Sequence, residues 1–450
     1  MPGESDTPNA AELAAARSHP VEDPYYPKTS NPEVDALHYF LDLHYRDERL
    51  TGTTTLTFRA TRRTDHLRLD LSDALHVSKV WLDDDPIDFE HHDDGLDLAA
   101  PGLTPDEPHT LVISYAGHPE STPAPSYRSD MSDGLGWSTA PDGSVYTFQE
   151  PYGAFTWYPV NDHPSDEALY DARIETAATD VGVFNGILHG QLSDKTSARN
   201  VTRWHVDEPV ASYLITLAIG PYQRYTGTTD HGLTISYWLM PKDKQLLPQL
   251  RSEGREAFDW LTQHAGPYPF SSLGVVVVGG QSAMETQTML TMSRATVNRP
   301  DAVVAHEMAH QWFGDSVSPN DWQGLWLSEG WAMYMQQWYE ADTGRYEYGG
   351  GIRQWRRYDD MSRRLSGPPG DYDPKSFGDV NVYLGPAMML DQIRQQVGDR
   401  PFEDLVRAWP AEHANENVDR TTFTRWINAT TKHDFTPLID NWLDSAHTPR

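Results

Sequence analysis

The chain has 450 residues, with 35 basic and 66 acidic side chains and a net charge of −31 at pH 7. A negative field of this size repels nucleic-acid phosphates and anionic membrane surfaces, so we expect neither as a partner. The chain contains no cysteine, which excludes disulfides, thiolate metal ligands and a cysteine nucleophile. Any metal must therefore be held by histidine and carboxylate groups.

Length and hydropathy predict a globular protein of two domains. Aromatic residues make up 11% of the chain, which supplies ample apolar packing area. The longest strongly apolar run, Val275 to Val278, is too short to span a bilayer, and Met1 to Arg17 has no apolar stretch of the signal-peptide type. We therefore expect a cytoplasmic protein.

The first half of the chain has the alternating pattern of strands. Residues 1–33 are rich in Pro, Glu, Ser and Asn and predict a flexible tail, with a short helix over Ala10–Arg17. Apolar residues then alternate, and we expect a turn at Thr51-Gly52. A mostly antiparallel β domain is predicted over residues 34–221, with runs at Tyr39–Tyr45, Leu67–Leu71, Val77–Leu82, Leu111–Tyr115, Ile174–Ala178, Val201–Val206 and Tyr213–Ile219.

Beyond Gly220-Pro221 the apolar period lengthens to that of helices, which predicts an α-rich domain over residues 222–450. Two of its helices frame the most informative motif of the chain, one starting at Pro300-Asp301 and stopping at Gly314, the other covering Leu325–Asp342. The remaining predicted elements are a strand at Val275–Val278 and helices at Lys244–His264, Pro386–Val397, Phe402–Trp409, Thr422–Thr430 and Thr436–Ser445.

The motif is His306-Glu307-Met308-Ala309-His310, followed after 18 residues by Glu329. On a helix the two imidazoles lie on one face and can hold one metal ion, while Glu307 lies about 100° further round and faces a metal-bound water. Catalytic zinc usually takes three protein ligands, and a carboxylate on the next helix can supply the third. The pattern predicts one zinc ion on His306, His310 and Glu329, with Glu307 as the general base of a hydrolase.

The segment Gly279-Gly280-Gln281-Ser282-Ala283-Met284-Glu285-Thr286 precedes this motif. Together the two resemble the zinc aminopeptidases of the aminopeptidase N family, which carry Gly-x-Met-Glu-Asn, then His-Glu-x-x-His, then 18 residues and Glu. The resemblance covers nearly the whole chain. It includes Tyr25-Tyr26-Pro27, His38-Tyr39, Trp157-Tyr158-Pro159 with Asp162, Pro269-Phe270, and Phe435–Leu443 at the close of the catalytic domain.

The resemblance implies an α+β fold: a saddle-like antiparallel β domain followed by a thermolysin-like, mainly helical zinc peptidase domain. It also implies roles for individual residues. Glu285 binds the free α-amine of a peptide, Glu150 is a second carboxylate for that amine, and Tyr383 in Val382-Tyr383-Leu384-Gly385-Pro386 stabilises the oxyanion. Gln149, Ala283 and Met284 line the substrate site. Nothing follows Arg450, so we expect a short form without the family's C-terminal helical domain.

The sequence departs from the family pattern at three positions. Thr286 replaces the family's Asn after the amine-binding Glu, Ser282 replaces the Gly that opens that motif, and Phe148 replaces a Gln. The predicted function is hydrolysis of the N-terminal peptide bond of peptides with a free N-terminus. Two alternatives stay open: a zinc epoxide hydrolase of the leukotriene hydrolase type, and a peptide-binding scaffold without catalysis.

Overall fold

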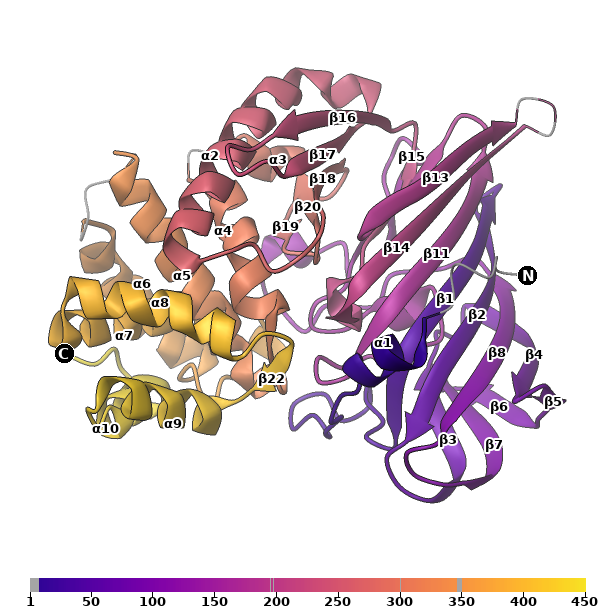
Figure 1. Ribbon diagram of the computed structural model, residues 1–450, viewed down its shortest axis with the longest axis horizontal. Helices are drawn as coiled ribbons and strands as arrows, with labels where there is room; N and C mark the ends of the chain where they lie inside the picture. Colours follow the sequence, from indigo (N-terminus) through magenta and orange to yellow (C-terminus); the bar gives the residue numbers. More distant parts are fainter. Residues whose placement is uncertain (1–7, 195, 197, 300, 346–349) are drawn as a thin grey trace.

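Strands dominate the first half of the chain and helices the second, and the two halves lie side by side in the computed structural model (Figure 1). The structure describes residues 8–194, 196, 198–299, 301–345 and 350–450. The predicted α+β class is confirmed. Within the described residues, no helix is both long enough and apolar enough to cross a bilayer. The cytoplasmic location stays a prediction.

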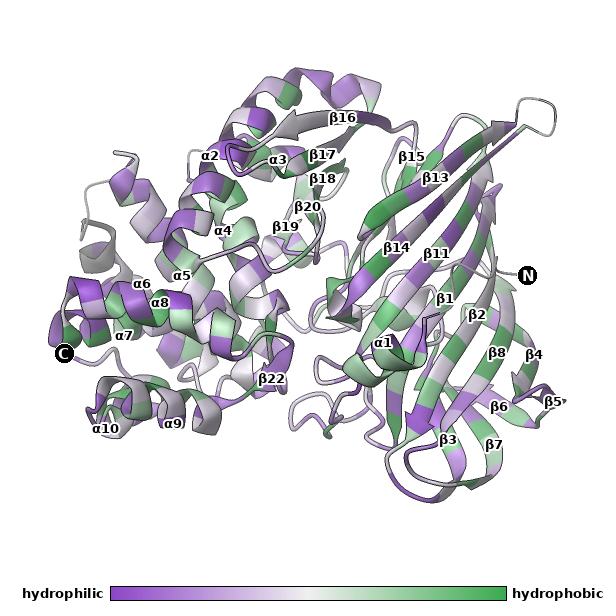
Figure 2. Ribbon diagram, in the orientation of Figure 1, coloured by the Kyte–Doolittle hydropathy of each residue, from purple (hydrophilic) through white to green (hydrophobic). Residues whose placement is uncertain are grey.

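An eight-stranded sheet is the frame of the first half. Neighbouring strands are antiparallel except β1 and β11, which run parallel. Hydropathy alternates along the strands because successive side chains point to opposite faces of the sheet (Figure 2). From edge to edge the order is β13 (Ile187–Asp194), β14 (Arg199–Ala211), β11 (Glu167–Ala177), β1 (Val34–Arg46), β2 (Arg49–Ala60), β8 (Pro108–Gly117), β4 (Leu75–Leu82) and β5 (Asp85–Pro86).

Two smaller sheets complete this half. One contains β3 (Thr64–Asp70), β7 (Gly95–Leu103) and β6 (Phe89–His92), and the other contains β12 (Val181–Phe184), β15 (Leu217–Gly220), β10 (Val145–Phe148) and β9 (Gly136–Thr139). The strand expected over Tyr213–Ile219 is shorter than predicted. A 3₁₀ turn over Ser212–Leu214 precedes β15. The amide of Ile215 closes this turn by donating to the carbonyl of Ser212.

The prediction of a turn at Thr51-Gly52 is wrong, because both residues lie inside strand β2. The chain reverses between β1 and β2 at Asp47 and Glu48, whose φ angles are 52° and 60°. Asp tolerates this left-handed conformation comparatively well, which suits it to a tight turn. Gly52 lies inside β2 for a different reason: a Cβ there would come within 2.3 Å of the Tyr115 ring on β8. Close packing between strands, and not a turn, requires that glycine.

The helical half begins with a further sheet of five strands. Its order is β16 (Gln223–Thr228), β17 (Thr234–Leu239), β18 (Leu273–Val278), β20 (Met289–Ser293) and β19 (Ala283–Met284), with β19 at the edge. The change of sheet between β15 and β16 falls close to residue 221, although the domain boundary itself stays a prediction. A two-stranded sheet joins β21 (Val317–Pro319) to β22 (Glu416–Val418).

The helices of this half are α2 (Leu247–Ala265), α3 (Arg294–Val297), α4 (Val303–His310), α5 (Leu325–Asp342), α6 (Gly350–Ser366), α7 (Asn381–Val397), α8 (Asp399–Glu412), α9 (Arg420–Thr431) and α10 (Thr436–Asp444). The metal helix begins at Val303, later than expected from Asp301, while Pro300 lies outside the described residues. Residues Pro241–Leu246 form a 3₁₀ helix before α2, so its predicted start at Lys244 is too early.

Helix α6 is absent from the predicted elements because its buried face is polar. Asp359 and Arg363 are buried and form an ion pair of 2.8 Å between the Arg363 Nε and an Asp359 carboxylate oxygen. Tyr358, Met361 and Leu365 are exposed instead. An apolar period therefore cannot indicate which face of this helix is inside.

Part of the predicted flexible tail is packed against the body of the protein. Helix α1 (Ala10–Ala15) forms as expected, with a capping box at Asn9. The buried Asp23 carboxylate accepts hydrogen bonds from the amides of Tyr25, Tyr26 and Trp322, and the Tyr26 hydroxyl donates to the carbonyl of Pro374. This segment therefore connects the helical half to the start of β1. Residues 1–7 lie outside the described part of the chain.

Candidate metal centre and substrate cleft

Helices α4 and α5 bring His306, His310 and Glu329 together. The Nε2 atoms of the two histidines are 3.2 Å apart, and a Glu329 carboxylate oxygen lies 3.2 Å from His306 Nε2 and 3.3 Å from His310 Nε2. Tetrahedral zinc with ligands at about 2.0–2.1 Å places neighbouring donor atoms about 3.3 Å apart. The three predicted ligands therefore fit one zinc ion without rearrangement.

The turn after α4 sets the orientation of His310. With Nε2 facing Glu329, the other ring nitrogen donates to Ser328 Oγ (2.9 Å) and to the carbonyl of Phe313 (3.2 Å). Such partners fix the tautomer and the ring plane of a metal-binding histidine. The carbonyl reaches His310 because the chain leaves the helix in a wide turn over Gln311–Asp315, where Gly314 has a φ of 140°.

A cavity of about 740 Å³ lies in front of these ligands, between the two halves of the molecule. The strand-rich half contributes Arg128, Asp130, Phe148 and Glu150 to its walls. The helical half contributes the edge strand β19, the metal helix and the first turn of α7. Among the lining residues are Ala283, Met284, Glu285, His306, Glu307, His310, Glu329 and Tyr383.

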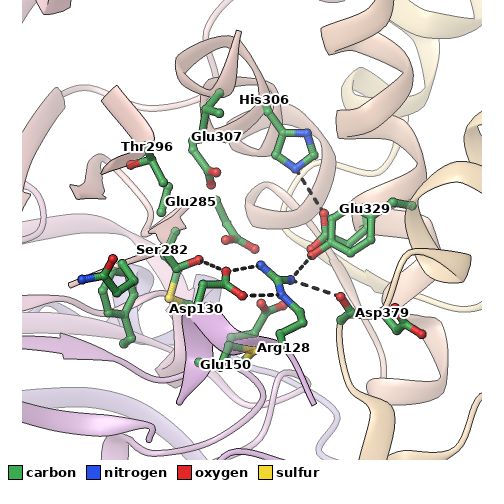
Figure 3. A pocket seen from close by; sticks show the side chains of 18 of the residues that line it. Arg128, Asp130, Glu150, Ser282, Glu285, Thr296, His306, Glu307, Glu329 and Asp379 are labelled. Atoms are coloured by element: carbon green, nitrogen blue, oxygen red, sulfur yellow. Dashed lines mark hydrogen bonds and ion pairs between the residues drawn. The ribbon is translucent and has the colours of Figure 1, made fainter. Parts of the chain in front are cut away.

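Three further carboxyl groups converge on the metal ligands. Oxygen or nitrogen atoms of Glu285, Glu307 and His310 all lie within 4.8 Å of one another, and Glu150 faces them from the other side of the cavity (Figure 3). Burial raises the pKa of Glu150, Glu285 and Glu307, and the negative charge of neighbouring carboxylates adds to the effect. One carboxylate oxygen of Glu285 is buried with no hydrogen-bond partner in the described structure.

The ligand carboxylate behaves in the opposite way. Burial alone would raise the pKa of Glu329, but the hydrogen bonds and charge of His306 and His310 lower it. Burial lowers the pKa of His306; it also disfavours protonation of His310, whose pKa is nevertheless raised by Glu285 and Glu329. Acidic side chains outnumber arginines in the lining of the cavity, which favours the binding of cations.

Tyr383 enters the cavity from the first turns of α7. Its ring stacks on the His306 ring, with centroids 6.1 Å apart and planes at 28°. The Tyr383 hydroxyl oxygen accepts a hydrogen bond of 3.0 Å from Arg128 Nη1. This contact joins the strand-rich half to the helical half beside the metal ligands.

The remaining predicted residues divide into two groups. Ala283 and Met284 line the cavity, but Gln149 does not. Gln149 is fully buried, and hydrogen bonds satisfy both ends of its side-chain amide. The nitrogen donates to the carbonyl of Ser212 (2.7 Å), and the oxygen accepts from the Trp157 indole (2.9 Å). The neighbouring Phe148 faces the cavity in its place. The position of Gln149 thus argues against the expected substrate contact.

The departure at Thr286 also has a structural role. Its side chain is fully buried and hydrogen bonds to the carbonyl of Met289 and to Thr291 Oγ1. It therefore reinforces the turn between β19 and β20 and does not line the cavity. Ser282, in contrast, donates from its hydroxyl to Asp130 (2.8 Å) inside the cavity.

Two lining residues, Arg128 and Asp130, are absent from the predicted site. They lie in the connection between β8 and β9, which carries no motif, and their place becomes clear only when the two halves meet. The segment Pro125–Asp130 contains one arginine among many in the chain. No signal in the sequence distinguishes it from the others.

Comparison with known proteins agrees with this geometry. The peptidase family M1 domain matches residues 255–442, and the peptidase M1 N-terminal domain matches residues 35–214. The chain belongs to peptidase family M1. The assignment confirms the resemblance to aminopeptidase N and the order of the two domains in the family.

Individual members of family M1 match at low identity over long stretches. Leucine aminopeptidase 2 of Saccharomyces cerevisiae is 25% identical over 72% of this chain and 49% of its own length. Aminopeptidase N of Acetobacter pasteurianus is 26% identical over 69% of this chain and 90% of its own. The chain spans about half the length of the yeast relatives that it matches.

A solved M1 zinc metallopeptidase from Deinococcus radiodurans superposes with a TM-score of 0.79 and 25% identity. The match covers 94% of this chain and 97% of that one. A variant of the Deinococcus enzyme was solved with a Tyr-Ser-Ala substrate bound, and it superposes with a TM-score of 0.80.

Proposed function

We propose that this protein is a zinc aminopeptidase that hydrolyses the first peptide bond of peptides with a free N-terminus. The observation that carries the proposal is the position of Glu285. Its unpartnered carboxylate oxygen is buried in the same cavity as the three zinc ligands and Glu307. A buried carboxylate without a partner is costly, and an ammonium group is the ligand that best compensates for it.

The amine of the substrate would sit between Glu285 and Glu150, which face the cavity from different halves of the molecule. Both carboxylates are at a fixed distance from the zinc ligands because they belong to packed strands and loops. A substrate held by its α-ammonium would then present only its first peptide bond to Glu307. Substrates with a blocked amine would lose this anchor.

The chemistry follows from the groups around that bond. Zinc, when bound to His306, His310 and Glu329, would polarise the carbonyl and make water a better nucleophile. Glu307 would accept the proton of the attacking water and deliver it to the leaving nitrogen, a task suited to a carboxyl whose pKa burial has raised. The Tyr383 hydroxyl would donate to the oxygen that becomes negative.

The edge position of β19 supports binding of an extended peptide. Strand β19 pairs with β20 on one side only, and Ala283 and Met284 line the cavity. An extended peptide can hydrogen bond along such an edge. The Tyr-Ser-Ala peptide bound to the Deinococcus relative is a substrate of this kind.

A panel of amino-acid anilides tests the proposal directly. We expect hydrolysis of substrates with a free amine, no measurable hydrolysis of their N-acetylated forms, and loss of activity after treatment with a chelator, restored by zinc. Equal cleavage of acetylated and free substrates would refute the aminopeptidase assignment while keeping a zinc hydrolase. An amino-acid anilide compared with a lipid epoxide separates the peptidase from the epoxide hydrolase.

Glu307→Gln tests the general base. We expect kcat to fall at least about a hundredfold, because proton transfer by a positioned group contributes factors of this size. Zinc content, measured by metal analysis of the purified protein, should not change, since Glu307 is not one of the three ligands. Near-full activity of the variant would show that another group moves the proton.

A further inference from the structure

Arg128 occupies a position that the proposed mechanism does not yet use. It comes from the strand-rich half, yet its guanidinium contacts both halves. Nε and Nη2 donate to the Asp130 carboxylate at 3.1 and 2.6 Å, and Nη1 donates to the carbonyl of Gly378 at 3.1 Å and to the Tyr383 hydroxyl oxygen at 3.0 Å. In Figure 3 the Arg128 side chain lies between Asp130 and Glu329.

The direction of the contact between Arg128 and Tyr383 has a chemical consequence. A guanidinium group can only donate, so the Tyr383 oxygen must be the acceptor. The phenol hydrogen is therefore not used in this contact and can be donated elsewhere. Because the ring stacks on the zinc ligand His306, the hydroxyl stays beside the metal centre. The positive charge of the guanidinium beside the phenol oxygen also makes the phenol a stronger hydrogen-bond donor.

The guanidinium is itself held from a second side. Asp130 binds Arg128 with both carboxylate oxygens and accepts a further hydrogen bond of 2.8 Å from Ser282 Oγ. Paired bonds of this type fix the plane of a guanidinium. Ser282 directly precedes β19, so a continuous set of contacts, Ser282 to Asp130 to Arg128 to Tyr383, connects the substrate strand to the first turns of α7. The serine that replaces the family's glycine thus supplies one hydrogen bond of this set.

We propose that Arg128 is a positioning residue for Tyr383, which it holds with the phenol hydrogen directed at the substrate oxyanion, and that Asp130 and Ser282 anchor Arg128 in that orientation. This inference rests on the aminopeptidase function proposed above. Arg128 would act on the transition state and not on the bound amine, because its contacts lead to Tyr383 and not to Glu285.

The test is a double-variant cycle on the zinc-loaded protein with the best anilide of the panel. Arg128→Gln should lower kcat about 10- to 100-fold and leave KM within about twofold, somewhat less than the loss of an oxyanion donor itself. In the Tyr383→Phe background the same substitution should have almost no further effect. Losses of kcat that multiply in the double variant would overturn the proposal, since Arg128 would then act independently of Tyr383.

A cycle of melting temperatures separates this inference from the proposed function. The Tm loss of the double variant should be smaller than the sum of the two single losses, whether or not the protein is active, and purely additive losses would refute the contact. A wild-type protein that hydrolyses no free-amine substrate would refute the function but would leave the Tm cycle interpretable.

Two further variants complete the design. If Arg128→Gln does not fold, Asp130→Asn replaces it in both cycles, because it removes the anchor and keeps the arginine. Arg364→Gln is the matched control, since Arg364 forms an exposed ion pair with Asp360 on α6 and lies away from the cavity. Its kcat should stay within twofold of wild type, and a fall as large as that of Arg128→Gln would mean that general loss of positive charge explains both.

Discussion

At the scale of single residues, the environment decides which carboxylates are available to a ligand. Glu285, Glu307 and Glu329 all lie in one buried site, and a carboxylate oxygen of Glu329 lies within 3.3 Å of the Nε2 atoms of both histidines. Glu285 keeps an oxygen free. A glutamate side chain is therefore a candidate metal ligand at one position and a candidate amine receptor at another, according to the groups around it.

Glu285→Gln tests amine recognition. The change keeps the shape of the side chain and removes its charge, so we expect KM for free-amine anilides to rise about 10- to 100-fold, the equivalent of one charge-assisted hydrogen bond. Zinc content should be unchanged. Asp133→Asn, at an exposed position on the rim of the cavity, is the control and should leave KM within about twofold. An unchanged KM for Glu285→Gln would contradict the assignment of the amine site.

At the scale of elements, the candidate metal site depends on how α4 ends. Both histidines lie on one short helix, but the orientation of His310 comes from the turn after it and from Ser328 on α5. Gly314 permits the turn after α4 to pass close to the His310 ring and the Ser328 side chain. A Cβ at residue 314 would come within 2.3 Å of Ser328 Oγ and 2.9 Å of His310 Nδ1, in a backbone conformation that side chains rarely adopt.

Gly314→Ala should weaken zinc binding. We expect an increase of about 10- to 100-fold in the zinc dissociation constant, the usual result of disturbing the partner of a metal-binding histidine. Competition with a chromogenic chelator measures the constant. Gly190→Ala is the matched control, because a Cβ there meets no atom within 4 Å. Equal zinc affinities for wild type and Gly314→Ala would show that the turn adapts without moving His310.

At the scale of the whole molecule, the cleft exists because two halves with separate sheets meet beside the proposed zinc ligands. The N-terminal segment helps to join them. Asp23 accepts the amide hydrogen of Trp322, at the start of the turn that leads into α5, and the His163 ring lies 3.4 Å from the same carboxylate. Burial would raise the pKa of Asp23, but the nearby His163 ring and the hydrogen bonds from the Trp322 and Tyr26 amides lower it.

Asp23→Asn should destabilise the protein at pH 7. An amide cannot accept from Trp322 and from the tyrosine amides at the same time, so we expect a loss of about 1.5–3 kcal/mol in the free energy of unfolding. Urea denaturation followed by tryptophan fluorescence measures it. The exposed neighbouring substitution Glu22→Gln should change stability by less than about 0.5 kcal/mol.

The same site predicts a pH dependence. The pKa of Asp23 is lower in the folded protein than in the unfolded chain, where it is about 3.9. Its contribution to the free energy of unfolding is therefore complete above the unfolded pKa and is lost as pH falls through the folded pKa. The difference in unfolding free energy between wild type and Asp23→Asn should therefore be constant between pH 5 and 7 and shrink below about pH 4. A difference that grows on acidification would contradict the lowered pKa.

Local patterns predicted much of this architecture. Composition identified α5 over Leu325–Asp342, which is rich in Trp, Met, Tyr and Gln and lacks Pro. The alternation of apolar residues identified most strands of the first half, because those strands bury one apolar face. The pattern failed where burial does not follow hydropathy. Helix α6 buries Asp359 and Arg363 and exposes Tyr358, so the hydropathy of its buried face is that of a solvent-exposed face. Gly52 was misassigned because its partner, Tyr115, lies on another strand.

The sequence by itself determined the proposed zinc ligands and the proposed general base Glu307, because a helix places residues four apart on one face whatever surrounds it. The resemblance to aminopeptidase N added Glu285, Glu150 and Tyr383. Only the tertiary structure decided the roles of Gln149, which is turned into the core, and of Arg128, which reaches Tyr383 from the other half of the molecule. The physical reason is that these contacts join segments distant in sequence, 63 residues apart for Gln149 and Ser212 and 255 residues apart for Arg128 and Tyr383. Tertiary packing, not local spacing, brings such segments together.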